Sequence, residues 1–159
     1  MSQIKIENIE KAVNKIDSLG DDALDKKIET FTLKQQHLVN YILQAGIEYE
    51  NEDLNVFSIY YFAIAHEAFD LEGMLLKEIS EDDIDAFQEP FVLALDAIHK
   101  NEDYSPMQDL TGQHHLMQFF MNEIEAADED GETLDDNTQT QLFIVLSGMV
   151  ALMNGAIQK

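Results

Sequence analysis

The stretch LFIVLSGMVALMNGAI, residues 142–157, decides the fold class, because its sixteen residues carry no charge in an otherwise strongly acidic chain. At about 1.5 Å per residue, such a helix is roughly 24 Å long, whereas a bilayer core needs about 30 Å. A helix that is apolar on nearly every side is typically buried at the centre of a bundle. We therefore expect a central apolar C-terminal helix rather than a membrane anchor.

A ridge of small side chains runs along this stretch. Ser147, Ala151 and Gly155 recur every four residues and therefore share one face of the helix. Small side chains let a second backbone approach closely. The ridge suits packing against a neighbouring helix or, in a homodimer, against a second copy of the chain.

Outward from this stretch, the sequence predicts an all-α fold: a single-domain helical bundle of about six helices, spanning residues 1–159. Only two Pro and seven Gly interrupt the chain, which favours helices over short strands and turns. A capping box from Thr32 to Gln35 is expected to start a new helical segment, and Pro90 to kink or split a helix. Apolar residues at spacings of three and four place the helices at about 4–19, 21–49 with a break near 30–32, 53–72, 80–98, 105–124 and 137–157.

The cysteine content and the N-terminal sequence bear on the compartment. The chain contains no Cys, which excludes disulfides, thiolate nucleophiles and Cys metal sites and fits a reducing cytoplasm. The first sixteen residues alternate Lys and Glu along an Ile and Val pattern, unlike the uninterrupted apolar core of a signal peptide. We therefore expect a cytoplasmic protein.

The net charge of −23 restricts the kinds of partner. The chain has 32 acidic residues against nine Lys and no Arg. Residues 78–158 contain eighteen acidic residues and one Lys, Lys100. Solubility alone needs a net charge of about 2–8 in a small domain. A surface that binds phosphates needs clustered cations, so nucleic acid and anionic membranes are unsuitable partners.

The leading hypothesis is a small, non-enzymatic binding protein whose acidic half docks a basic protein surface. An immunity protein or inhibitor, a nucleic-acid mimic and an adaptor all fit this description. The motivating observation is the uncompensated negative charge of one half of the chain. The predicted partner-binding residues are Glu81, Asp82, Asp83, Asp85, Asp128, Glu129, Asp130, Glu132, Asp135 and Asp136.

The helix at 53–72 offers a second interpretation, a small-ligand-binding helical bundle. His66 and Asp70 are four residues apart, so their side chains can meet. Phe62 and Phe69 lie on the same arc, which makes these four residues candidates for a ligand pocket. The opposite arc is the predicted core face, formed by Phe57, Tyr60, Tyr61, Ile64, Ala68 and Leu71.

A third interpretation is a magnesium-dependent all-α phosphohydrolase, in which Glu50, Asp53, Glu67 and Asp70 hold the metal. The spacing of these two pairs is similar to that of the paired carboxylates in all-α nucleotide pyrophosphatases. About six pairs of this spacing are expected from the acidic composition alone. The chain has no Glu-x-x-His, which argues against a di-iron bundle. We therefore expect no cofactor and no catalytic residues, and the enzyme interpretation remains an alternative.

Overall fold

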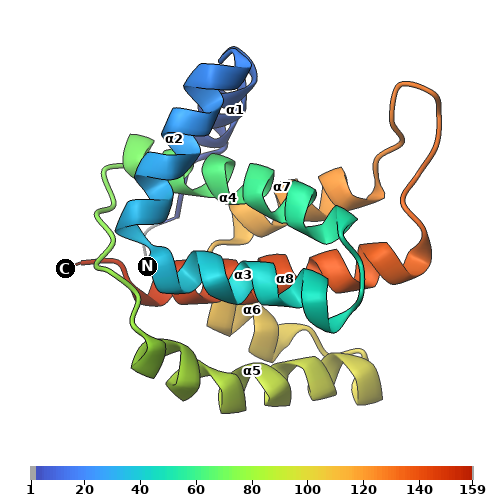
Figure 1. Cartoon of the computed structure of the whole chain (residues 1–159). Coiled ribbons are helices and arrows are strands. Elements are labelled where there is room, and N and C mark those ends of the chain that lie inside the picture. The colour runs from blue at the N-terminus through green and yellow to red at the C-terminus, as the bar shows by residue number, and fades with distance from the viewer. Residues whose placement is uncertain (1–2, 159) are drawn as a thin grey trace.

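The computed structural model describes residues 3–158, and this range contains eight α-helices and no β-strand (Figure 1). The predicted all-α bundle is confirmed, with eight helices rather than six. The helices are α1 (Ile6–Asp17), α2 (Asp21–Lys34), α3 (Gln36–Glu48), α4 (Asp53–Leu71), α5 (Glu81–Asn101), α6 (Ser105–Thr111), α7 (His114–Glu125) and α8 (Asp136–Gly155).

Two of the predicted helices are each divided into two. Gln35 separates α2 from α3, because its backbone leaves the helical region with φ −137° and ψ 52°. The expected capping box at Thr32 is absent: the Thr32 hydroxyl donates to the Ile28 carbonyl inside α2. Gly112, with φ +67°, separates α6 from α7. Pro90, by contrast, does not divide α5, which continues through it with Pro90 on an exposed face.

Helices α4 and α8 form the centre of the bundle, as expected for the uncharged stretch. Helix α8 contacts α3, α4, α5, α6 and α7. Its side chains Leu142, Leu146, Met149 and Met153 are fully buried. Among the residues that the structure describes, no helix is both long enough and apolar enough to cross a membrane.

Helix α4 is buried on more sides than the predicted core face allows. Leu71, assigned to that face, is 37% exposed, whereas Phe62 and Phe69 on the opposite arc are fully buried. The reason is that α1, α2, α3 and α8 all pack against α4. The arc that carries the candidate pocket residues is therefore covered by other helices of the chain.

Buried glutamine side chains connect segments that are distant in the sequence. The Gln35 amide donates to the Lys77 carbonyl and accepts from the Ile79 N–H, both over 2.9 Å. The same connecting segment meets the C-terminus, because Leu76 and Ile157 form an isolated antiparallel bridge. These bonds hold the link between α4 and α5 against the end of α8.

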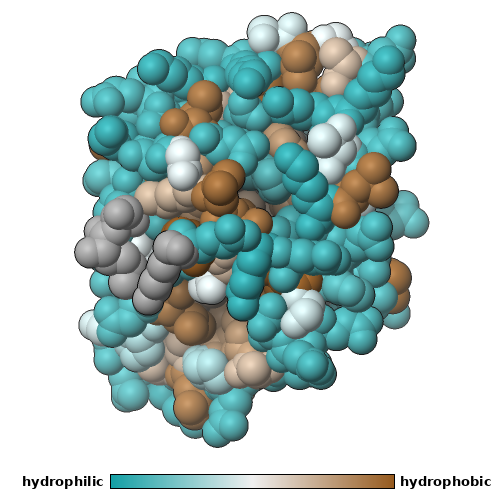
Figure 2. Space-filling view, turned by 90° about the vertical axis from the view of Figure 1, so that its left-hand side faces the viewer, coloured by the Kyte–Doolittle hydropathy of each residue, from teal (hydrophilic) through white to brown (hydrophobic). Residues whose placement is uncertain are grey.

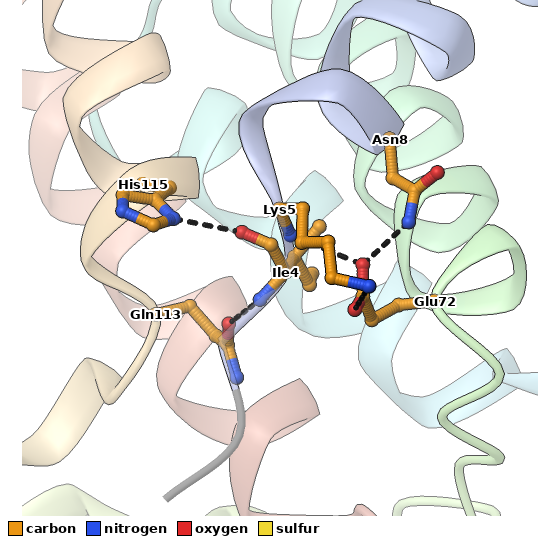
Figure 3. Close-up of polar contacts among 6 residues, drawn as sticks. All are labelled: Ile4, Lys5, Asn8, Glu72, Gln113 and His115. Carbon is orange, nitrogen blue, oxygen red and sulfur yellow. Dashed lines mark hydrogen bonds and ion pairs between the residues drawn. The ribbon is translucent and has the colours of Figure 1, made fainter.

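The N-terminal segment is fixed by Glu72, directly after α4, and by side chains from the α6–α7 region (Figure 3). The Ile4 N–H donates to Gln113 Oε1 over 2.9 Å, and His115 Nδ1 lies 3.0 Å from the Ile4 carbonyl oxygen. Glu72 Oε2 accepts from the backbone N–H of Lys5 and from the side-chain amide of Asn8. Both termini lie on one side of the molecule, where hydrophilic side chains cover most of the surface and apolar atoms appear in separate groups (Figure 2).

Candidate functional site

The candidate ligand-pocket residues lie inside the core. Phe62 and Phe69 are fully buried, and His66 is 4% exposed. The imidazole of His66 stacks on the ring of Phe31, with centroids 3.9 Å apart. Asp70 Oδ2 lies 3.5 Å from His66 Nδ1, at the edge of this cluster. The structure thus brings the four residues together on α4, but α2 fills the space beside His66 with Phe31.

Glu67 is the centre of a partly buried ion-pair cluster that sequence reasoning did not predict. Its side chain is 3% exposed and accepts from two ammonium groups, Lys15 Nζ at 2.5 Å and Lys27 Nζ at 3.0 Å. Lys27 also lies 5.2 Å above the centre of the Phe31 ring. Because Lys15 belongs to α1 and Lys27 to α2, Glu67 joins both helices to α4.

The electrostatics of this cluster favour its charged form. Burial by itself would raise the pKa of Glu67, but hydrogen bonds from Lys15 and Lys27 outweigh it and hold this pKa below its usual range. The hydrogen bond to Glu67 correspondingly raises the pKa of Lys15. The neighbouring His66 imidazole lowers the pKa of Asp70. Glu67 is therefore a structural anion with both oxygens occupied, which leaves it poorly suited to bind a metal.

The four residues proposed for a magnesium site do not meet. Glu50 and Asp53 lie at the start of α4, whereas Glu67 and Asp70 lie near its end. At about 1.5 Å per residue, the rise from Asp53 to Glu67 is roughly 21 Å, too far for a shared ion. Within residues 3–158, no group of three or more His, Asp or Glu side chains is arranged to hold a metal ion.

The ten predicted partner-binding acids form two groups rather than one surface. The start of α5, with Glu81, Asp82, Asp83 and Asp85, lies at one end of the molecule, and the α7–α8 loop with the start of α8 lies at the opposite end (Figure 1). The α5 group has basic side chains nearby: His37 Nδ1 lies 3.6 Å from Glu81, and Lys77 Nζ lies 4.0 Å from Asp83. The acidic half of the sequence is thus not one acidic face of the fold.

The second group gains acids that the sequence analysis had not assigned to it. The side chain of Asn51, in the turn between α3 and α4, donates to Thr138 Oγ1 and to Gln141 Oε1, each over 3.0 Å. These bonds place the α3–α4 turn beside the start of α8. We call the combined surface the acidic end; its ten exposed acids are Glu48, Glu50, Glu52, Asp53, Asp128, Glu129, Asp130, Glu132, Asp135 and Asp136.

Some of these acids stabilise the local fold. Asp135 caps α8, because its carboxylate accepts from the Thr138 N–H over 2.7 Å and this bond lowers the pKa of Asp135. Asp128 Oδ1 accepts from the N–H groups of Asp130 and Glu132, each over 2.9 Å, and so shapes the turn of the loop. Away from the acidic end, Ser80 and Asp83 form a capping box at the start of α5. Among the side-chain hydrogen bonds of the described residues, none involves the carboxylate of another acid of the acidic end.

The small-residue ridge of α8 packs mainly within the chain. Ser147 is fully buried and Ala151 is 6% exposed, while Gly155 lies exposed at the end of the helix. Two of the three residues are thus covered by helices of the same chain, so the ridge does not present a dimer surface.

Comparisons with protein-family models, with curated proteins and with solved structures found no match to this chain.

Proposed function

We propose that this chain is a non-enzymatic binding protein that docks a basic protein surface through its acidic end. One observation supports the proposal above all others. Ten exposed acids from two distant parts of the sequence lie at one end of the molecule, in segments that contain no Lys. The nearest Lys along the sequence is Lys34, fourteen residues before Glu48. Charge of one sign without local partners costs stability through repulsion, and contact with a cationic surface relieves that cost.

The distribution of the lysines supports the same choice of surface. Six of the nine Lys lie between residues 5 and 34, in and beside α1 and α2. Lys15 and Lys27 are engaged by Glu67, and Lys5 lies 3.6 Å from Glu72. The molecule therefore has a nearly neutral region around α1 and α2 and a strongly negative acidic end, an asymmetry that orients an approaching cationic partner.

The expected physical behaviour is fast, salt-sensitive association. Uncompensated surface charge steers an oppositely charged partner, and association rate constants then reach about 10⁸ M⁻¹s⁻¹ at low salt. At 0.1 M ionic strength the screening length is about 10 Å, so the attraction weakens steeply as salt is added.

Affinity capture with the immobilised full chain tests the proposal. The acidic-end variant removes four charges without touching the two acids that shape the loop and cap α8; it is E129Q/D130N/E132Q/D136N. The matched control removes four charges from the start of α5 and the segment before it; it is E78Q/E81Q/D82N/D85N. We expect the wild type and the control to retain a basic protein from lysate at 50 mM NaCl but not at 500 mM. The acidic-end variant should retain little at either salt concentration. Equal retention by both variants, or retention that is independent of salt, would contradict the proposal.

A further inference from the structure

An open apolar groove lies between α2 and the first half of α4. Its volume is about 600 Å³, and six of its seven lining residues are apolar or aromatic. Val56 on its α4 side is 71% exposed. The lining residues are Leu24, Ile28, Asn55, Val56, Phe57, Ile59 and Tyr60. We call this feature the α2–α4 groove.

The ring stacking and the ion pair that hold α2 against α4 both involve the far half of α4. Phe31 stacks on His66, and Lys27 pairs with Glu67, both near the C-terminal end of α4. Ile28 and Leu24 lie about one turn and two turns before Phe31 in α2, and both are only partly buried. Leu24 and Ile28 of α2 therefore lie beside the exposed Val56, and the first half of α4 remains partly uncovered.

Exposed acids surround this apolar lining. Asp21 and Asp25 stand three residues before Leu24 and Ile28, and so share their side of α2. Glu52 and Asp53 stand four and three residues before Val56, at the start of α4.

Asp17, at the end of α1, accepts a hydrogen bond from the Tyr60 hydroxyl on the groove wall. Of the neighbouring cations, Lys27 is engaged by Glu67, and Lys26, about 200° around α2 from Leu24 and Ile28, lies on its opposite face. The rim of the groove is therefore negative.

We propose that the α2–α4 groove receives the apolar face of a basic amphipathic helix of the partner. The proposal rests on the proposed function, and it names the partner element that the acidic surface recognises. An amphipathic helix places apolar residues at spacings of three, four and seven into such a groove, while Lys or Arg on its flanks reach acids at the rim. Glu52 and Asp53 belong both to this rim and to the acidic end, so one cationic partner contacts both surfaces.

Other occupants fit the rim less well. A second copy of this chain would bring its own negative rim against the first, and like charges that face each other across an interface oppose association. An anionic lipid or nucleotide meets the same repulsion. A neutral small molecule would fill the apolar lining but would leave the five rim acids without a cationic partner.

Fluorescence anisotropy with a designed peptide tests the groove. The probe is a labelled 18-residue helix with Leu at spacings of three and four and Lys elsewhere; a second peptide carries Glu in place of every Lys. Val56→Glu places a charge on the groove, and Leu93→Glu is the matched control on α5, where Leu93 is 61% exposed. Both positions are exposed, so both variants should retain the wild-type circular dichroism spectrum.

We expect the Lys peptide to bind the wild type and Leu93→Glu within twofold of each other, and Val56→Glu at least tenfold more weakly. The Glu peptide should not bind. If the two variants bind the Lys peptide equally well and binding still weakens with salt, the groove is not the site, although docking at the acidic end stands. If the wild type does not bind the Lys peptide at low salt, the groove proposal is overturned. Sedimentation of the free chain that shows a dimer lost in Val56→Glu would assign the groove to a second copy instead.

Discussion

Oε1 of Glu67 lies 2.5 Å from Nζ of Lys15, and the Glu67 side chain is 3% exposed while that of Lys15 is 51% exposed. The buried carboxylate of Glu67 thus pairs with the half-exposed ammonium side chain of Lys15. With Lys27 on the other oxygen, the same carboxylate joins α1 and α2 to the core. Residues of α2 and α4 line the α2–α4 groove. The cluster holds these two helices together and therefore also stabilises the groove, although its own residues do not line it.

Glu67→Gln should lower the free energy of unfolding by about 2–3 kcal/mol. The amide keeps the shape of the side chain but removes the charge that two ammonium groups share, and a hydrogen bond to a charged group is worth about 1.5–3 kcal/mol. Urea denaturation measures the change. The control is Glu10→Gln, an exposed acid on α1, for which a change within about 0.5 kcal/mol is expected. Equal stability of the two variants would show that Glu67 does not hold α1 and α2.

Lowering the pH should reduce the contribution of Glu67 to the free energy of unfolding. The pKa of Glu67 is lower in the folded chain than in the unfolded chain, because hydrogen bonds from Lys15 and Lys27 outweigh the effect of burial. The unfolded chain therefore takes up a proton at a higher pH. The contribution is complete above the ordinary Glu pKa of about 4.3 and is lost as the pH falls through the lowered folded-state pKa.

Urea titrations of wild type and Glu67→Gln at pH 6, 5, 4 and 3 test this sign. The difference in stability between the two proteins should be constant from pH 6 to pH 5 and should narrow below that. A difference that widens in acid would mean that the pKa of Glu67 is raised on folding.

Ser80→Ala should destabilise the chain by about 1 kcal/mol. The Ser80 hydroxyl accepts from the Asp83 N–H over 3.1 Å, and Asp83 Oδ2 accepts from the Ser80 N–H over 3.0 Å, which completes a capping box at the start of α5. Ser105→Ala is the matched control, because α6 has no side-chain cap bond. A loss at Ser105 as large as that at Ser80 would contradict this assignment.

Glu50→Gly should raise the free energy of unfolding by about 0.5–1 kcal/mol. Glu50 adopts φ +53° after α3, with the Asn51 N–H bonded to the Gly46 carbonyl and the Glu50 N–H to the Ile47 carbonyl. Glycine is the usual residue at this position of the motif, because an L side chain in the left-handed region costs about 1–2 kcal/mol.

Thermal and urea denaturation of Glu50→Gly and Glu50→Gln separate backbone from charge. Glu50→Gln removes the charge but keeps the strained side chain, so it should change stability by less than Glu50→Gly. If the glutamine variant gains as much, repulsion within the acidic end explains the effect and backbone strain does not.

The sequence predicts the fold class well because the main signals are local. The uncharged stretch of α8 and the three- and four-residue spacing elsewhere follow from burial on one side of a helix. The break at Gln35 is not local: its amide is bonded to Lys77 and Ile79, more than forty residues away. The local pattern therefore predicts a break near residues 30–32 but not its position at Gln35. The predicted core face of α4 is largely buried, but the opposite arc is buried as well, because α1, α2, α3 and α8 all pack against α4.

The candidate site is predicted less completely, because it depends on which helix ends meet. The acids of the α7–α8 loop were identified from charge alone. The acids from Glu48 to Asp53 join them only because Asn51 bonds to Thr138 and Gln141. A scan for charge along the sequence places the start of α5 in the same half, although it lies at the opposite end of the molecule (Figure 1). The one available signal was the absence of Lys between residues 35 and 76.

The most direct test of the central claim, docking of a basic partner at the acidic end, is the association rate constant with the captured protein as a function of salt. Stopped-flow measurements from 25 to 500 mM NaCl compare the wild type, E129Q/D130N/E132Q/D136N and E78Q/E81Q/D82N/D85N. We predict that the wild-type rate constant falls at least tenfold over this range, that the α5 control follows it, and that the acidic-end variant starts lower and depends less on salt. Rate constants that do not change with salt, or that fall in parallel for all three proteins, would contradict the account.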